Sequence, residues 1–345
     1  MSSLAKAIET GDLTQLPSRR DEDWRWTDLR GLLRTLPPTP GPTEVTTEGP
    51  FAALGGDLFL VPNGFVEGFT HIEGGSDSPV AQLRFVAAEA GSIATRVLVV
   101  VRAGQTLTLL ESHEALADGA VSDIALDIEV AEGGRLERIV LAADRAESVT
   151  VSTATVTLAP GASYAQTILT SGARRQRIET HVAHPGQGAS VRLDGAYLLQ
   201  DQRHVDTTSV VTHSGLGGVT SQLTKGVVDG QARGVFQGRI VVERGADQTD
   251  ARMGHHALIL SDKAEIDAKP ELLIFADDVQ CAHGNTVGAL DEDALFYAQQ
   301  RGMPFETARA MLTEAFVGEV VDRIEHEGAR EIAAAWVAQQ LGRGQ

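Results

Sequence analysis

The chain has 345 residues with a single cysteine, and 47 acidic against 29 basic side chains give a formal net charge of −18. One cysteine excludes an internal disulfide and a four-cysteine metal site made by this chain alone. The acidic charge disfavours binding to nucleic acid and to anionic membranes, which both require clustered Lys and Arg. No apolar run is long enough to span a membrane, and the N-terminus does not resemble a signal peptide, so we expect a cytoplasmic protein.

Residues 1–56 are predicted to form a helical lead followed by a linker. Apolar residues recur at helical spacing over Leu4–Ile8, and a similar period continues over residues 23–33. The stretch 37–42 contains four prolines and a glycine, which is typical of a break between structural elements. Two tryptophans so close to the N-terminus predict that this lead packs on the core of its own chain.

Residues 57–284 are predicted to be almost wholly β-structure. Runs such as Arg96–Val101 and Val149–Leu158 are rich in β-branched residues, and no long helical period interrupts them. A degenerate repeat lies inside this region, with turn glycines at steps of 29, 28 and 25 residues: Gly104, Gly133, Gly161 and Gly186. Regular steps of drifting length favour the stacked turns of a β-solenoid, although a β-sandwich also has regularly spaced strands.

Residues 285–345 are predicted to be helical. The acidic run Asp291–Asp293 suits a helix N-terminus, where carboxylates oppose the positive end of the helix dipole. The segment Gly302–Pro304 breaks the pattern, and an apolar stripe from Ala308 to Ile324 follows at helical spacing. Because so few residues make a thin domain, we expect this stripe to dock onto the β-region or onto another subunit.

The common motifs of catalysis and nucleotide binding are missing from the sequence. There is no GxxxxGK[ST] loop, so we expect no nucleotide on this chain, and there is no GxSxG or HExxH motif. His255 and His256 would point to opposite faces of a strand and therefore cannot chelate one metal. His204 and Asp206 would share a face, but a third strong ligand is not evident.

Residues 277–284, with the sequence DDVQCAHG, combine two candidate metal ligands. If the preceding strand-like run continues, Cys281 and His283 project from the same face, about 7 Å apart. A thiolate and an imidazole suit zinc, copper or iron, whereas the structural alternative is a buried thiol and a hydrogen-bonded histidine. Two ligands are too few for a closed site, so a metal here would need ligands from elsewhere, for example from a second subunit.

The same region carries a family resemblance. The following segments resemble, in order, the motifs of the SufB/SufD family of iron–sulfur cluster assembly proteins: residues 20–29, 204–206, 213, 225–227, 234–240, 269–272, 276–288, 295–297 and 300–302. The resemblance is strong over about residues 200–320, and the short chain with one cysteine is more like the SufD branch than the SufB branch. Many relatives carry a cysteine near residues 217–220, and this chain does not.

The resemblance implies a mainly β fold, a right-handed parallel β-helix flanked by helical N- and C-terminal regions. It implies a non-catalytic scaffold subunit of a SUF complex, which pairs with a SufB-like paralogue and binds a SufC-like ABC-type ATPase through helices at 305–341. It also implies a transient iron–sulfur cluster, or iron, shared with the partner subunit. The metal ligand of the family falls on His283, with Cys281 a weaker candidate.

Two alternatives from other functional classes stay open. One is a β-solenoid protein that cleaves or binds carbohydrate, although aromatic residues make up only 5% of the chain. The other is a structural protein without metal that forms a homodimer in isolation. Glycan binding, light scattering and iron titration of the purified chain would separate these alternatives from the scaffold hypothesis.

Overall fold

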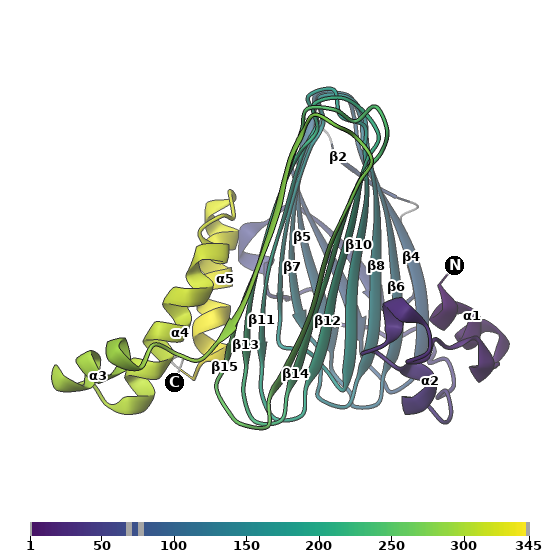
Figure 1. The fold of residues 1–345 in the computed structure, drawn as a ribbon. Helices are drawn as coiled ribbons and strands as arrows, with labels where there is room; N and C mark the ends of the chain where they lie inside the picture. The colour runs from purple at the N-terminus through teal and green to yellow at the C-terminus, as the bar shows by residue number, and fades with distance from the viewer. Residues whose placement is uncertain (1, 67–70, 75–78, 343–345) are drawn as a thin grey trace.

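The strands of the computed structural model, which describes residues 2–66, 71–74 and 79–342, form two parallel sheets that face each other (Figure 1). Successive strands alternate between the two sheets, so each turn of the chain adds one strand to each sheet. The two walls converge at one side of the cross-section and diverge at the other (Figure 1). This arrangement confirms the predicted β-solenoid and excludes the sandwich alternative, whose sheets are antiparallel.

Both sheets hold their strands in sequence order. The nine-stranded sheet, here sheet A, contains, among the described residues, β1 (Asp57–Pro62), β3 (Val80–Ala87), β5 (Thr106–Ala115), β7 (Arg135–Ala143), β9 (Ser163–Thr170), β11 (Ser190–Leu199), β13 (Val219–Val228), β15 (Thr249–Ile259) and β17 (Val279–Gly288). The opposite sheet, here sheet B, contains, over the same ranges, β2 (Ile72–Gly74), β4 (Ser92–Val101), β6 (Val121–Val130), β8 (Val149–Leu158), β10 (Arg175–His184), β12 (His204–His213), β14 (Arg233–Val242) and β16 (Glu265–Ile274). The strands β16 and β17 therefore form the last turn, at one end of the solenoid.

The predicted turn glycines lie at one corner of the solenoid, where a sheet B strand leads into the next sheet A strand. All of them have a positive φ between 65° and 71°, and Gly217 continues the series with a φ of 70°. This left-handed conformation is strained for residues with a Cβ atom, so glycine is favoured at each repetition of the corner. The glycines that repeat in the sequence therefore mark the same corner in successive turns.

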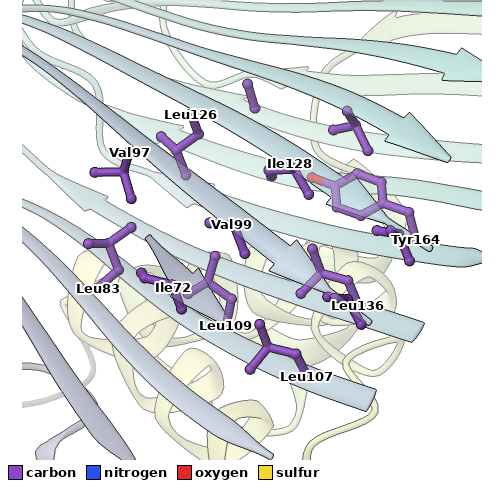
Figure 2. Close-up of a cluster of buried hydrophobic side chains, with 14 of the residues drawn as sticks. Ile72, Leu83, Val97, Val99, Leu107, Leu109, Leu126, Ile128, Leu136 and Tyr164 are labelled. Carbon is purple, nitrogen blue, oxygen red and sulfur yellow. The ribbon is translucent and has the colours of Figure 1, made fainter. Parts of the chain in front are cut away.

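The apolar core fills the space between the sheets, because alternate residues of every strand point inward. Val97 and Val99 of β4 face Leu107 and Leu109 of β5 across this space, and all four side chains are buried (Figure 2). Burying a side chain of this size contributes about 1.5–3 kcal/mol. The interior is therefore a packed core at this end of the solenoid.

The N-terminal region consists of short helical elements: α1 (Ser3–Thr10), the 3-10 turns Leu13–Gln15, Glu22–Trp24 and Ala52–Leu54, and α2 (Leu29–Leu32). The prediction of a helical period that continues over residues 23–33 is wrong for residues 25–28, which separate the 3-10 turn Glu22–Trp24 from α2. The reason is that this segment binds the outer face of sheet B. Thr27 Oγ1 donates to Asp206 Oδ2 at 2.6 Å, and Arg177 Nη1 donates to the carbonyl oxygen of Asp23 at 2.8 Å. The Trp24 ring lies 4.5 Å from the Arg177 guanidinium.

The C-terminal region forms three helices among the described residues, α3 (Glu292–Gln300), α4 (Phe305–Val321) and α5 (Glu327–Gln340), with the predicted break between α3 and α4. Val317 and Val320 of α4 and Val337 of α5 pack on the outer face of sheet A. The predicted stripe is only partly right, because Met311 is 40% exposed. Helix α3 projects away from the solenoid (Figure 1). None of the helices in the described ranges has the length and apolar composition to span a bilayer.

Candidate functional site

The last turn of the solenoid is open. Strand β17 pairs with β15 on one side, and among the described residues no strand pairs with its other side. The helices α4 and α5 lie against the face of sheet A and do not cross the end of the solenoid (Figure 1). The residues of β17 from Ala282 to Gly288 are exposed, whereas inward-facing residues one turn earlier, such as His255, are buried. An edge strand of this kind has free N–H and C=O groups that another chain can pair with.

Cys281 and His283 both lie on β17 and face the interior of the solenoid. Cys281 is opposite Ala251 and His283 is opposite Met253 in the parallel register, and both residues of β15 point inward and are buried. The two candidate ligands therefore share one face, as the alternation along a strand predicts. Cys281 is half-buried and His283 is exposed at the open end.

The two candidate ligands differ in chemistry. Cys281 packs in an apolar cluster with Ala251 and Met253. Burial raises the pKa of the Cys281 thiol, and the nearby Asp250 carboxylate acts in the same direction. A metal ligand must be a thiolate, so this environment disfavours Cys281 in the isolated chain. His283 offers an imidazole, the commonest metal ligand in proteins, at an exposed position of the same strand.

No group of three or more His, Cys, Asp or Glu in the described part of the chain is arranged to hold a metal ion. The pair His204 and Asp206 instead holds the N-terminal segment. His204 Nε2 donates to the carbonyl oxygen of Trp26 at 3.0 Å, and Asp206 accepts hydrogen bonds from Thr27 and Arg177. At the open end the described residues therefore offer Cys281 and His283 with no third protein ligand arranged beside them.

Sequence reasoning missed a hydrogen-bonded chain that ends beside His283. Tyr197 of β11 contacts His255 of β15, and His255 contacts Asn285 of β17, at 2.8 Å and 2.7 Å. Tyr197 reaches past the intervening strand because Gly226 has no side chain there, and a Cβ atom at Gly226 would lie 2.1 Å from Tyr197 Cζ. The glycine in the middle of a strand pattern is the one signal in the sequence that points to this close approach.

A second exposed surface lies on the C-terminal helices. Phe296 and Tyr297 of α3 are 62% and 61% exposed, and Phe305 at the start of α4 is 46% exposed. Large exposed apolar side chains on two adjoining helices are typical of an interaction surface. This surface is separate from the buried faces of α4 and α5 that hold the helices on sheet A.

The fold and the site define a parallel β-solenoid protein whose last turn presents an imidazole and a thiol at an unpaired sheet edge. The family described as "SUF system FeS cluster assembly, SufBD core domain" matches residues 84–316. The chain belongs to this family, which confirms the resemblance found in the motifs.

Named relatives agree with this assignment. The chain is 30% identical over 238 residues to an iron–sulfur cluster assembly SufBD family protein of Synechocystis, covering 66% of this chain and 52% of that protein. It is 30% identical over 243 residues to the iron–sulfur cluster assembly protein SufD of Escherichia coli, covering 70% and 57% of the two chains. SufD of Bacillus subtilis is 30% identical over 172 residues, which cover 46% and 39%. The chain spans about half the length of the first two relatives.

Proposed function

We propose that this chain is a non-catalytic, cytoplasmic scaffold subunit for iron–sulfur cluster assembly, and that His283 supplies one ligand to a transient cluster or iron. The observation that carries the proposal is the position of His283, exposed on the inward face of an unpaired edge strand. Membership of the SufBD family supports the same function. Cys281 is the weaker ligand, because its thiol must lose a proton in an apolar environment.

The remaining ligands come from a cysteine-rich SufB-like partner that docks at the open last turn. A partner strand can add to the free edge of β17 through backbone hydrogen bonds, in the manner of β-augmentation. Such pairing would place side chains of the partner next to Cys281 and His283 and would remove the site from water. In the absence of the partner, the same edge can pair with a second copy of this chain, and light scattering of the isolated protein tests for that homodimer.

A SufC-like ATPase binds the C-terminal region through the surface formed by Phe296, Tyr297 and Phe305. The inner faces of α4 and α5 are covered by sheet A, so they cannot serve as the ATPase surface. Each predicted region has its own proposed role. Residues 1–56 pack on the outside of the solenoid, with Leu4 and Leu29 on sheet B and Phe51 on sheet A. Residues 57–284 carry the metal site, and residues 285–345 bind the ATPase.

The test is co-expression of this chain with its SufB-like and SufC-like partners, with the affinity tag on a partner. His283→Ala is expected to leave the purified complex intact and to reduce its iron, its acid-labile sulfide and its visible absorbance to background. Cys281→Ala is expected to have a smaller effect. The matched control is His256→Ala, since His256 lies on the neighbouring strand but points to the outer face. An intact complex of the His283→Ala variant with the full cluster content would refute the ligand assignment.

A further inference from the structure

The chain of side chains from Tyr197 through His255 to Asn285 runs along the axis of the solenoid to its open end. Its three members come from β11, β15 and β17, so it crosses three turns of the structure. Tyr197 and His255 are fully buried, and Asn285 is exposed. The ring of Phe236 stacks on the imidazole of His255, with centroids 4.5 Å apart and an interplanar angle of 4°. The imidazole is therefore fixed on both of its nitrogens and on one face.

The direction of these hydrogen bonds follows from what each group can do. Asn285 Oδ1 only accepts, so the His255 Nδ1 atom that contacts it must carry the proton. In the neutral imidazole the other nitrogen, Nε2, is then an acceptor, and the Tyr197 hydroxyl donates to it. Burial lowers the pKa of His255 to about 4, which keeps this neutral form at physiological pH. A protonated His255 would also donate from Nδ1, so the orientation of Asn285 does not depend on the charge.

These hydrogen bonds fix the orientation of the Asn285 amide, at the end of the series nearest the open turn. With Oδ1 occupied by His255, the Asn285 amide is fixed with its two N–H donors, on Nδ2, turned away from the interior bond. Asn285 Nδ2 makes no hydrogen bond within the described part of the chain, and the exposed amide leaves its donors accessible to water or to a ligand. Asn285 and His283 are two residues apart on one strand, so their side chains stand on the same face, about 7 Å apart along the backbone. An oriented pair of solvent-exposed donors therefore flanks the exposed imidazole.

We propose that Asn285 donates a hydrogen bond to an anionic sulfur atom of the cargo bound at His283, either a sulfide of the cluster or a thiolate of the partner. Tyr197 and His255 are the positioning residues that hold the amide for this contact. The inference rests on the proposed function, because it takes His283 as the ligand. Hydrogen bonds to the sulfur atoms of a cluster stabilise their negative charge and raise the reduction potential, and outer contacts of this kind strengthen metal binding.

The hydrogen-bond chain is tested first in the isolated protein by nitrogen NMR with 15N-labelled histidine. We expect His255 to carry its proton on Nδ1, and Tyr197→Phe to populate the Nε2–H tautomer as well, because the donor to Nε2 is lost. Asn285→Ala should accelerate the exchange of the Nδ1 proton with water. An unprotonated Nδ1 in the native chain would overturn the proposal, since the amide of Asn285 would then have the opposite orientation.

The contact with the cargo is tested in the complex with the partner subunits. Asn285→Asp keeps the acceptor for His255 but replaces the two N–H donors with a second carboxylate oxygen. We expect a cluster that forms, has a lower reduction potential and is lost to a chelator roughly 10- to 100-fold faster than in the native complex. Asn285→Ala should also lower the reduction potential and speed the loss of the cluster, but by less than Asn285→Asp. Thr286→Val is the matched control, because it removes a comparable contact to His256 on the outer side of β17.

A failure of the role of Asn285 and a failure of the proposed function give different experimental results. If His283→Ala abolishes the cluster while Asn285→Asp retains the native potential and the native rate of loss, the role of Asn285 is wrong and the proposed function stands. If His283→Ala retains the native cluster, the proposed function fails and the inference about Asn285 fails with it. An equal effect of Thr286→Val would show that any disturbance of β17 is sufficient, and it would also overturn the specific role of Asn285.

Discussion

The ion pair between Glu111 and Arg138 in the solenoid interior is expected to dominate the stability of the neighbouring turns. Both side chains are fully buried, and the guanidinium contacts the carboxylate at two points, with N–O distances of 2.7 and 2.8 Å. His113 Nε2 lies 2.7 Å from the same carboxylate, and Gln166 accepts a hydrogen bond from Arg138 Nη1. The perturbation is Glu111→Gln, which keeps the shape of the side chain and removes its charge.

The size of the effect follows from the geometry of the pair. At 2.7 Å the attraction between two unit charges is about 6 kcal/mol for an effective dielectric constant of about 20. Burial, the largest influence, raises the pKa of Glu111, but the charge of Arg138 and the hydrogen bonds from His113 and Arg138 outweigh it and lower the pKa from 4.5 to about 2. A difference of this size between the pKa of Glu111 in the folded and unfolded chains corresponds to about 3 kcal/mol of stability. Because the pKa of the folded state is depressed, this stability is present above about pH 4.5 and is lost as the pH falls towards 2.

Removing the carboxylate charge leaves the guanidinium of Arg138 buried without a counter-charge, which costs about 3–5 kcal/mol in comparable cases. Thermal and urea unfolding, followed by circular dichroism at pH 7 and pH 3, should show a lower midpoint for Glu111→Gln at pH 7. They should also show a smaller loss of stability on acidification than in the native chain. The exposed Glu129 on β6 provides the control, since Glu129→Gln should change stability by less than about 0.5 kcal/mol. A cost below about 1 kcal/mol for Glu111→Gln, or an unchanged acid dependence, would refute the reasoning.

Four further outcomes are expected. Gly226→Ala places a Cβ atom against the ring of Tyr197 and should lower the free energy of unfolding by about 1–3 kcal/mol. Gly318→Ala in α4 meets nothing within 4 Å and should raise it by about 0.5–1 kcal/mol, and urea denaturation compares the two. Burial raises the pKa of Asp123 to about 6, so the stabilisation present below about pH 4 is lost as the pH rises through 6. Asp123→Asn should therefore reduce the drop in Tm between pH 4.5 and 7.5, and an unchanged drop would argue against this assignment. Phe296→Ser should release the ATPase from the complex without lowering Tm, and unchanged co-purification would exclude α3 as its surface.

Local patterns were sufficient for much of the fold and for part of the site. The corner glycines required no tertiary information, because a positive φ is a property of one residue and its neighbours. The shared face of Cys281 and His283 likewise follows from the alternation of side chains along one strand. The helical period at residues 23–33 was misleading for the same reason. The helical period reflects only the local spacing of apolar residues, whereas the contacts of Thr27 and Trp24 with the outer face of sheet B determine the conformation.

The sequence by itself determined the solenoid, the helices at both ends and the family, and it placed Cys281 and His283 on one face of a strand, since each of these depends on local spacing repeated along the chain or on contiguous motifs. Only the tertiary structure decided that β17 is the last strand of sheet A within the described ranges, that α4 and α5 are held by sheet A, and that Asn285 is oriented by Tyr197 and His255. The last contacts join residues 58 and 30 positions apart in the chain. Such partners are brought together by the stacking of whole turns, and the length and register of each turn emerge only when all of its strands have paired.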